Sequence, residues 1–346
     1  MIKVSVNASR QYDVMIGSGL LQNAGQMIRE VSAGTKVIVV SDDNVYPIYG
    51  DSLSRSLAES GFEVYSFVIE NGEKSKNLTE YGRLLNTMCE KHFTRRDVVA
   101  GLGGGVVGDL AGFAAATYQR GTGFVQIPTS LLAAVDSSVG GKTAIDLDMG
   151  KNQVGCFYQP LCVICDTDTL KTLPDEEYSN GCAEVIKYAM IQSKELFEKI
   201  NDKPVKEQYG EVIRDCVSMK RDYVERDEFD TGERMKLNFG HTIGHAVETL
   251  SNYTIPHGQA VAIGMAKITR ALVRRQICPA EVSDRLQNLL EAYNLRTDTD
   301  FADEELVKVT LNDKKGTGRT TRLVIVRDIG ESEILEVSNE SMPLYV

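Results

Sequence analysis

The first half of the chain alternates short apolar runs with segments of helical periodicity, and this alternation restricts the folds that the chain can adopt. Residues 36–40, 63–69 and 97–102 have the composition of buried strands. Residues 51–60 and 78–92, which lie between them, have apolar positions at helical spacing. Strands that alternate with helices form parallel sheets with helices on both faces. We therefore predict an α/β domain with a Rossmann-like parallel sheet, to which residues 124–127 and 161–165 add further short strands.

The second half of the chain has a different pattern, which is mainly helical. Pro174 followed by Asp175 combines a residue that is excluded from helix interiors with an acidic first turn, and this marks a boundary. We predict an α/β domain over residues 1–174 and a mainly α-helical domain over residues 175–346. Helical periodicity extends over residues 176–200, 206–228, 235–251, 257–276 and 280–293, and residues 322–326 have the pattern of a late strand.

The composition excludes several classes of partner. The chain has 346 residues, of which 42% are hydrophobic and 25% are charged, as in ordinary globular proteins. Its 38 Lys and Arg residues against 49 Asp and Glu residues give a formal net charge of −11, which argues against nucleic acid and anionic membranes as partners. No apolar run reaches the roughly 18 residues of a transmembrane helix, and the N-terminus lacks the apolar core of a signal peptide. We expect a cytoplasmic protein.

The seven cysteines support the same compartment, because their spacing is not that of a disulfide framework. Cys162 and Cys165 form a CxxC pattern, but they lie inside an apolar run that is predicted to be a strand. Burial in that strand is therefore favoured over a redox or zinc-binding role.

A glycine-rich turn follows the predicted strand at residues 97–102. Residues 103–108 match the G-x-G-x-x-G pattern and lead into an apolar helix predicted over residues 110–118. Such a turn allows backbone N–H groups to approach a pyrophosphate at a helix N-terminus, so we predict a dinucleotide site. No acidic residue lies about twenty positions after Gly108; Asp42 and Asp43, which follow an earlier strand, are therefore the candidates for ribose contact.

Three of the four histidines lie within a short stretch of the second domain. His241 and His245 are four residues apart, which places both rings on one face of a helix, and His257 follows shortly after. Gly240 and Gly244 alternate with them and allow close approach of a backbone or a ligand. Neutral imidazole is a common metal ligand and a proton carrier. We predict a metal or proton-transfer site here; the alternative is a group of structural histidines on an amphipathic helix.

Other charged residues are candidates for substrate contacts. Lys142, Lys151 and Asn152 lie beside glycines and can bind phosphate or carboxylate; the alternative is a solvated loop. Glu184 and Lys187 are three residues apart on one face of a predicted helix; the alternative is a surface ion pair. Arg234 and Asn238 precede His241 by about two turns and one turn, on the same face of the predicted helix.

These motifs together resemble the 3-dehydroquinate synthase family of sugar-phosphate cyclases over nearly the whole chain. The resemblance is densest in residues 103–121, 127–155, 181–188 and 220–265. It implies an N-terminal Rossmann-like domain that binds NAD and a mainly helical C-terminal domain that binds metal and substrate. The implied reaction converts 3-deoxy-D-arabino-heptulosonate 7-phosphate into 3-dehydroquinate and phosphate, in the shikimate pathway to chorismate and aromatic amino acids. It proceeds by transient NAD oxidation, phosphate elimination, re-reduction and intramolecular aldol cyclisation.

The resemblance also assigns residues. Spacing alone pairs His241 with His245, but the family pattern implies that Glu184, His241 and His257 bind a divalent metal, usually zinc, for which cobalt can substitute. Arg120 resembles an arginine offered to a neighbouring subunit, which implies a homodimer, and Lys314 or Lys315 resembles a phosphate contact. The implied substrate residues are Asp136, Lys142, Asn152, Lys187, Lys220, Arg234, Asn238 and His245. The implied NAD residues are Asp42, Asn71, Gly72, Glu73, Lys74, Ser75, Lys76, Gly104, Gly105, Val106, Val107, Gly108, Asp109, Thr129, Ser130, Lys142, Lys151, Thr169, Leu170, Lys171 and Thr172.

Three positions depart from the family pattern, and three other functions compete. Gln259 stands where Glu is usual and could weaken support of the metal, Ser130 replaces Thr, and Asp230 replaces Glu. The competing functions are a sister cyclase for another sugar phosphate, a metal-dependent polyol dehydrogenase, and a nucleotide-binding module without activity. A dehydrogenase would release NADH in each turnover, whereas a synthase shows no net redox change.

Overall fold

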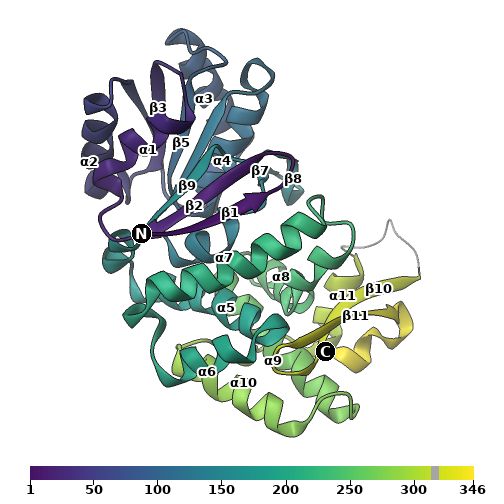
Figure 1. Ribbon diagram of the computed structural model, residues 1–346. Coiled ribbons are helices and arrows are strands. Elements are labelled where there is room, and N and C mark those ends of the chain that lie inside the picture. The colour runs from purple at the N-terminus through teal and green to yellow at the C-terminus, as the bar shows by residue number, and fades with distance from the viewer. Residues whose placement is uncertain (313–318) are drawn as a thin grey trace. The chain divides into compact units, whose positions relative to one another are not determined.

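The computed structural model describes residues 1–312 and 319–346, and these form two compact units (Figure 1). The first unit comprises Met1–Pro174 and Ile213–Phe229, and the second comprises Asp175–Val212 and Asp230–Val346. One division of the structure thus follows Pro174, where the sequence pattern changes. The segment Ile213–Phe229 packs with the first unit, although its helical pattern resembles that of the second.

The first unit is built on a seven-stranded sheet with the order β1-β2-β9-β6-β5-β3-β4. The pairings from β2 to β4 across this order are all parallel, and only the edge strand β1 is antiparallel to its neighbour, β2. The predicted parallel sheet is therefore confirmed. The strands are β1 (Ile2–Asn7), β2 (Gln11–Gly17), β3 (Lys36–Asp42), β4 (Glu63–Ile69), β5 (Val98–Gly103), β6 (Gly123–Pro128) and β9 (Cys162–Asp166).

Helices cover both faces of this sheet. Alternate strand residues point to opposite faces, and apolar side chains on each face pack against helices. Val37 and Val39 of β3 pack in one apolar cluster with Leu53 of α2, whereas Ile38 of β3 packs in another with Leu110 of α4. The strand positions in both clusters are fully buried, which explains their continuous apolar sequence. The helices are α1 (Ala24–Val31), α2 (Tyr46–Glu59), α3 (Leu78–Glu90) and α4 (Gly105–Thr117).

The residues around Lys142 and Asn152 form an antiparallel hairpin, not a loop. Its strands are β7 (Lys142–Leu147) and β8 (Gly150–Phe157), and they pair from Lys142 with Phe157 onward. Their sequence is polar because one side of the hairpin is exposed. Cys162 and Cys165 lie buried in β9, as predicted, and burial raises the pKa of each thiol to about 12.

The second unit is mainly helical; two of the helices predicted for it are broken in the structure, and α11 and β11 were not predicted. The predicted helix at 176–200 is interrupted at Ser193, whose hydroxyl caps the next helix by accepting from Leu196 N. The predicted helix at 235–251 begins only after Gly240, whose φ of 78° is left-handed. Its elements are α5 (Asp175–Gln192), α6 (Lys194–Asp202), the start of α7 (Tyr209–Arg226), α8 (His241–Leu250), α9 (His257–Arg274), α10 (Ala280–Ala292), α11 (Asp303–Asn312), β10 (Thr320–Asp328) and β11 (Glu331–Ser338). Among the described residues, no helix is both long and apolar enough to cross a membrane.

Candidate active site and metal centre

The predicted cofactor residues of the first unit gather where parallel strands end. Asp42 is the last residue of β3, and the four other segments begin within three residues of the ends of β4, β5, β6 and β9. These five strands are consecutive neighbours in the sheet, so their carboxyl ends share one edge. Ligands of parallel α/β sheets bind outside this edge. The four segments are residues 71–76, 104–109, 129–130 and 169–172.

The glycine-rich turn joins β5 to α4 and presents a helix N-terminus at this edge. Gly104 is the residue before the helix, with extended backbone angles, and α4 begins at Gly105. A side chain at Gly105 would approach the Ser137 hydroxyl to 3.3 Å, so glycine keeps the turn close to its neighbour. Thr129, at the end of β6, donates its N–H to the carbonyl of Gly103 at 3.0 Å and fixes the two turns together. A helix N-terminus without side chains in its way suits a pyrophosphate.

The two candidates for ribose contact have different surroundings. Asp43 accepts the backbone and side-chain N–H groups of Asn71 at 2.8 and 2.9 Å and so ties the β3 and β4 ends together. Asp42 accepts the N–H groups of Asn44 and Val45 at 3.0 and 2.9 Å. Burial raises the pKa of Asp42 against these hydrogen bonds. Each aspartate thus accepts two hydrogen bonds from nearby residues, and the family resemblance, not the geometry, favours Asp42.

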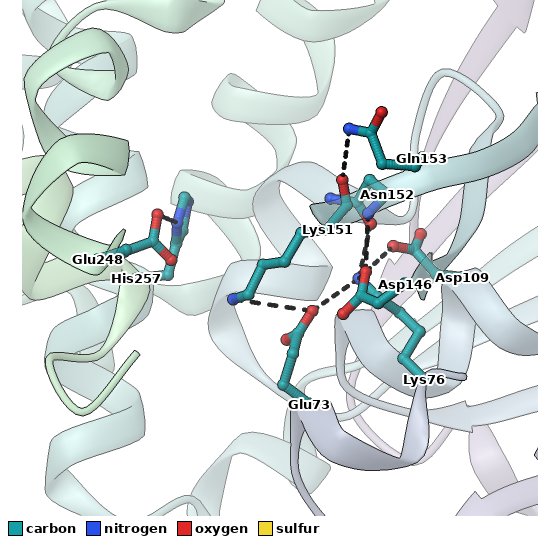
Figure 2. Close-up of polar contacts among 9 residues, drawn as sticks. All are labelled: Glu73, Lys76, Asp109, Asp146, Lys151, Asn152, Gln153, Glu248 and His257. Carbon is teal, nitrogen blue, oxygen red and sulfur yellow. Dashed lines mark hydrogen bonds and ion pairs between the residues drawn. The ribbon is translucent and has the colours of Figure 1, made fainter. Parts of the chain in front are cut away.

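Lys76 is the centre of a charged network between the β4 end, α4 and the hairpin (Figure 2). Its ammonium lies 2.8 Å from Glu73 Oε1, 3.3 Å from Asp109 Oδ2 and 3.8 Å from Asp146 Oδ1. It also donates to the amide oxygen of Asn152 at 2.8 Å. The side chain of Lys76 is only 5% exposed, so one buried cation holds together three carboxylates from three segments.

Burial and charge shift the pKa values in this network in different directions. Burial raises the pKa of Asp109 to about 6, although Lys76 opposes the shift. Burial disfavours the charged form of Lys76, but Asp109 and Glu73 outweigh it and raise the pKa of Lys76. Lys151 lies at the edge of the network, 3.9 Å from Glu73 Oε1. The network thus brings together five residues that were predicted as cofactor or substrate contacts: Glu73, Lys76, Asp109, Lys151 and Asn152.

A second pair of predicted residues in the first unit is Asp136 and Lys220. Asp136 lies in the π-helical turn Ala133–Ser137, and Lys220 lies on α7. The ammonium of Lys220 donates to both the backbone carbonyl and the carboxylate of Asp136. The Lys220 side chain is 8% exposed, so this is a largely buried ion pair. Lys142, at the start of β7, is exposed.

In the second unit, three helices bring Glu184, His241 and His257 together. Glu184 lies on α5, and His241 and His257 are the first residues of α8 and α9. Oε1 of Glu184 lies 3.6 Å from Nε2 of His241 and 3.3 Å from Nε2 of His257. The three ligand atoms, one from each residue, all lie within 4.8 Å of one another.

This set fits a zinc or cobalt ion. Ligand atoms at 2.0–2.1 Å from a tetrahedral ion lie about 3.3 Å apart, close to the distances between Glu184 and the two histidines. Burial lowers the pKa of His241 to about 3 despite the attraction of Glu184, so its imidazole is neutral and able to bind metal. The Nδ1 atom of His241 lies 3.1 Å from the carbonyl oxygen of Phe239, which leaves Nε2 for the ion. Two histidines and one carboxylate are a common ligand set of catalytic zinc.

His257 has a partner that the sequence pattern did not identify, Glu248. Nδ1 of His257 lies 3.4 Å from Oε2 of Glu248 (Figure 2). Burial favours neutral His257, but the hydrogen bonds to Glu184 and Glu248 outweigh it and raise its pKa to about 10. The two carboxylates thus favour a protonated His257 ring. A bound dication would take the place of the proton on Nε2. The only signal in the sequence was the position of Glu248 seven residues after His241, two turns along α8.

Gln259 does not support the metal site in this structure. Its side chain donates to the carbonyl of Asn294 at 3.0 Å and accepts the N–H of Arg296 at 2.8 Å. The residue thus fixes the chain after α10, and the expected weakening of metal support by Gln259 has no structural basis. The contact to His257 comes from Glu248 instead.

The remaining predicted residues of the second unit include two buried cations. Lys187 is 1% exposed and lies 2.5 Å from Glu184 Oε2, so the reading of this pair as a surface ion pair is wrong. Arg234 is 2% exposed. The prediction that Arg234 and Asn238 lie on the helix of His241 is also wrong. They lie in the 3₁₀ segment Glu233–Asn238, which Gly240 separates from α8.

Two further predicted residues, His245 and Arg120, are exposed. His245 is on α8 and is exposed, with its ring centroid 5.5 Å from that of His241. Arg120 is exposed at the end of a 3₁₀ turn, and its φ of 67° is unusual for a residue other than glycine. Lys314 and Lys315 lie outside the described residues.

The chain is similar to 3-dehydroquinate synthases along nearly its full length. It matches the family models described as 3-dehydroquinate synthase N-terminal over residues 66–180 and 3-dehydroquinate synthase C-terminal over residues 181–316. It is 45% identical over 337 residues to a 3-dehydroquinate synthase of Clostridium perfringens strain 13, with 96% of each chain covered. It is 42% identical to that of Lactococcus lactis subsp. cremoris strain MG1363, with 100% of this chain and 99% of the relative covered.

Solved structures of related synthases share the fold. The chain matches 2-epi-5-epi-valiolone synthase from Streptomyces hygroscopicus, solved with NAD⁺ and Zn²⁺, with a TM-score of 0.87, 25% identity and coverage of 99% of this chain and 97% of the other. It matches 2-deoxy-scyllo-inosose synthase, solved with carbaglucose-6-phosphate, NAD⁺ and Co²⁺, with a TM-score of 0.89, 24% identity and full coverage of both chains. A glycerol dehydrogenase from Schizosaccharomyces pombe shares the fold more distantly, with a TM-score of 0.63, 19% identity and coverage of 90% of this chain and 84% of the other.

Proposed function

The chain belongs to the 3-dehydroquinate synthase family, and from this premise we propose that it converts 3-deoxy-D-arabino-heptulosonate 7-phosphate into 3-dehydroquinate and phosphate in the shikimate pathway. The observation that carries the proposal is the pair of buried cations, Lys187 and Arg234, in the unit that holds the metal-ligand set. These cations give an acidic chain a means to bind an anionic sugar acid phosphate.

Glu184, His241 and His257 would hold the divalent metal, for which we propose zinc. A bound metal of this kind supplies Lewis acidity that lowers the pKa of substrate hydroxyls and polarises a ketone. Glu184 contributes a second effect, because its other oxygen contacts Lys187 and so places a cation beside the ligand set. The support for this assignment is the ligand spacing and the contact of His241 Nδ1 with the carbonyl of Phe239, which leaves Nε2 for the metal.

The NAD would be held at the carboxyl edge of the sheet in the first unit. When bound, NAD supplies a reversible hydride acceptor. The N-terminus of α4 would bind the pyrophosphate, and Asp42 would accept from the ribose. The Lys76 network would order the segment after β4 around the cofactor. The further NAD contacts that we propose are Thr129, Ser130, Lys142, Lys151 and residues 169–172.

Both units carry residues that we propose for the substrate. Lys142, Lys220 and Asn152 in the first unit and Lys187, Arg234, Asn238 and His245 in the second would bind its charged and hydroxyl groups. His245 is exposed, and we propose it as a proton carrier near the leaving phosphate, a role that is common for histidine. Asp136 would orient the ammonium of Lys220, with which it is paired.

The experiment that tests the function measures three quantities in one reaction mixture. The protein is incubated with the heptulosonate phosphate, zinc and NAD at a small fraction of the substrate concentration. We expect phosphate and 3-dehydroquinate to form in equal amounts over many turnovers per NAD, without accumulation of NADH. Stoichiometric NADH release with a polyol, and no phosphate release, would support the dehydrogenase function that the shared fold also permits. Phosphate release only from another sugar phosphate would support a sister cyclase.

We also propose a homodimer in which Arg120 of one subunit serves the site of the other. Arg120 is exposed and held in an uncommon backbone conformation, and such conformations occur most often at functional sites. Mixing inactive Arg120→Ala and His257→Ala proteins tests this. If the sites are shared in a symmetric dimer, equal mixing restores about a quarter of wild-type activity, and no restoration would overturn the sharing. A cytoplasmic location stays a prediction from the sequence.

A further inference from the structure

The imidazole of His257 lies between two buried carboxylates. Its Nε2 atom is 3.3 Å from Glu184 Oε1, and its Nδ1 atom is 3.4 Å from Glu248 Oε2. The side chains of Glu184 and Glu248 are 1% and 7% exposed, so both carboxylates are buried. The two ring nitrogens therefore face different carboxylates from different helices.

Glu248 is fixed in place by the helix that also carries His241. The two residues are seven positions apart, so they lie on the same face of α8. The carbonyl of Glu248 accepts the N–H of Tyr253 at 2.8 Å and the hydroxyl of Ser251 at 2.9 Å, which anchors this end of the helix. The helix thus presents one proposed ligand and, two turns later, the carboxylate that contacts the other.

The two histidines differ in what holds their Nδ1 atoms. For His241 this is the neutral carbonyl oxygen of Phe239, at 3.1 Å, whereas for His257 it is a carboxylate. A hydrogen bond to a carboxylate is the stronger of the two and makes the opposite ring nitrogen a better donor to a metal. His257 is also the more exposed ring, at 35% against 12%, so its orientation depends more on a polar partner.

We propose that Glu248 is a positioning residue for the metal centre, which holds His257 in the tautomer and orientation that direct Nε2 towards the ion. This inference rests on the proposed metal site of Glu184, His241 and His257. Glu248 adds a second buried negative charge close to the bound dication. Residues of this kind contribute about 10- to 100-fold to metal affinity.

A different arrangement of the same atoms is the main alternative. His245, Glu248 and His257 also bring one ligand atom each within 4.8 Å of the others. In that arrangement Glu248 would itself be a ligand of the ion, together with His245 and His257. Glu184 and His241 would not be ligands. The two arrangements predict opposite results for His241 and His245 variants.

The test measures zinc affinity of the full-length protein by competition with a chromogenic chelator, and the visible spectrum of the cobalt-loaded protein. The variants are Glu248→Gln, Glu248→Asp and Glu248→Ala, with Gln259→Ala as the matched control. Gln259 lies on the first turn of α9, two residues after His257, but its side chain contacts the chain at Asn294 and Arg296. Thermal unfolding of each metal-free variant shows which of them fold.

We expect Glu248→Ala to bind zinc about 10- to 100-fold more weakly than the wild type. Glu248→Gln, which keeps an acceptor oxygen, should lose less, and the control should keep wild-type affinity. Because all three ligands remain, the cobalt spectrum should keep its tetrahedral bands at saturating metal.

Each remaining outcome overturns a defined statement. If Glu248→Ala keeps wild-type zinc affinity while Glu184→Gln and His257→Ala lose zinc, the positioning role of Glu248 is overturned. The proposed metal site itself then stands. Loss of zinc in His245→Ala but not in His241→Ala would make Glu248 a ligand and overturn its positioning role. Absence of tight zinc in the wild-type protein would overturn the proposed metal site itself. If Glu248→Ala does not fold, the Glu248→Gln and Glu248→Asp affinities decide, and wild-type values in both would overturn the proposal.

Discussion

A methyl group on Gly264 would come within 2.0 Å of the carbonyl oxygen of Gly240, so the backbone of α9 lies in direct contact with the residue that precedes α8. A second contact is at Gly244, where a methyl group would lie 3.0 Å from the carbonyl of Ala260. Gly240 precedes His241, and Gly264 lies two turns after His257 on its helix. The separation of the two histidines therefore depends on the absence of side chains at this crossing.

We predict that Gly264→Ala destabilises the protein and weakens zinc binding together. The added methyl group must push α9 away from Gly240, and overpacking of this kind costs about 1–3 kcal/mol. The same shift separates His257 from His241. Urea unfolding of the metal-free protein and chelator competition measure the two effects.

Gly210→Ala is the matched control for this substitution. Gly210 lies in the first turn of α7, and no atom lies within 4 Å of a methyl group there. Ala is favoured over Gly in a helix by up to about 1 kcal/mol, so this variant should be as stable as the wild type or more so, with unchanged zinc affinity. Equal stability of Gly264→Ala and the wild type would show that the crossing can relax.

The proposed ligand set predicts which variants lose metal. Glu184→Gln, His241→Ala and His257→Ala should each be isolated without tightly bound zinc and without activity, because each removes one of three protein ligands. His245→Ala should keep one zinc per chain while losing activity. Metal analysis after gel filtration measures this, and a His257→Ala protein with stoichiometric zinc would contradict the assignment.

Arg234 tests substrate recognition. We predict that Arg234→Lys lowers kcat/KM by at least about a hundredfold, because a lysine cannot reproduce the planar two-pronged contact of a guanidinium with phosphate or carboxylate. With 2% exposure, Arg234→Ala should also lower stability, so the lysine variant is the cleaner probe. Steady-state kinetics and thermal unfolding are measured for both variants. A folded lysine variant with near-normal turnover would exclude the role.

The apolar pattern was sufficient to predict the parallel sheet, because β3 and β5 are buried on both faces and leave no other placement for continuous runs of Val, Ile and Leu. The hairpin β7–β8 could not be predicted in this way. One of its faces is exposed, so polar residues interrupt the pattern, and its pairing depends on contacts with distant segments, such as the N–H of Asp146 donating to the carbonyl of Lys76. The break at Gly240 was missed because helical periodicity continues across it.

The sequence could indicate the candidate site only in part. The three histidines were visible as a cluster, but choosing Glu184 as their partner needed the family resemblance, since it lies 57 residues before His241. Glu248 carries no local signal that separates it from a surface carboxylate, and only the packing of α8 against α9 places it beside His257. The Lys76 network likewise joins the segment after β4 and the start of α4 to the β7–β8 hairpin, which lies outside the seven-stranded sheet, so the order of that sheet does not predict it.

The carboxyl of Asp109 predicts a pH dependence of stability in the absence of NAD. Its pKa is raised from 3.8 to about 6, chiefly by burial. Between these values the folded protein keeps a proton that the unfolded chain has lost, so this group's contribution is complete below pH 3.8 and is lost as pH rises through about 6. At 1.36 kcal/mol per pKa unit the loss is on the order of 3 kcal/mol.

Asp109→Asn removes this dependence, since an amide does not titrate. The difference in the free energy of unfolding between Asp109→Asn and the wild type, measured by urea denaturation between pH 4 and 7, should therefore change in favour of the variant as pH rises towards 6 and stay constant above it. Using the difference cancels the titration of carboxylates that do not interact with Asp109; Glu73 and Asp146 do interact with it. Asp148→Asn, in the exposed turn of the β7–β8 hairpin, removes the same charge without the burial and should show a flat difference. If the difference for Asp109→Asn is flat as well, Lys76 keeps Asp109 ionised throughout this pH range. The two residues are then a permanent ion pair at the proposed cofactor site.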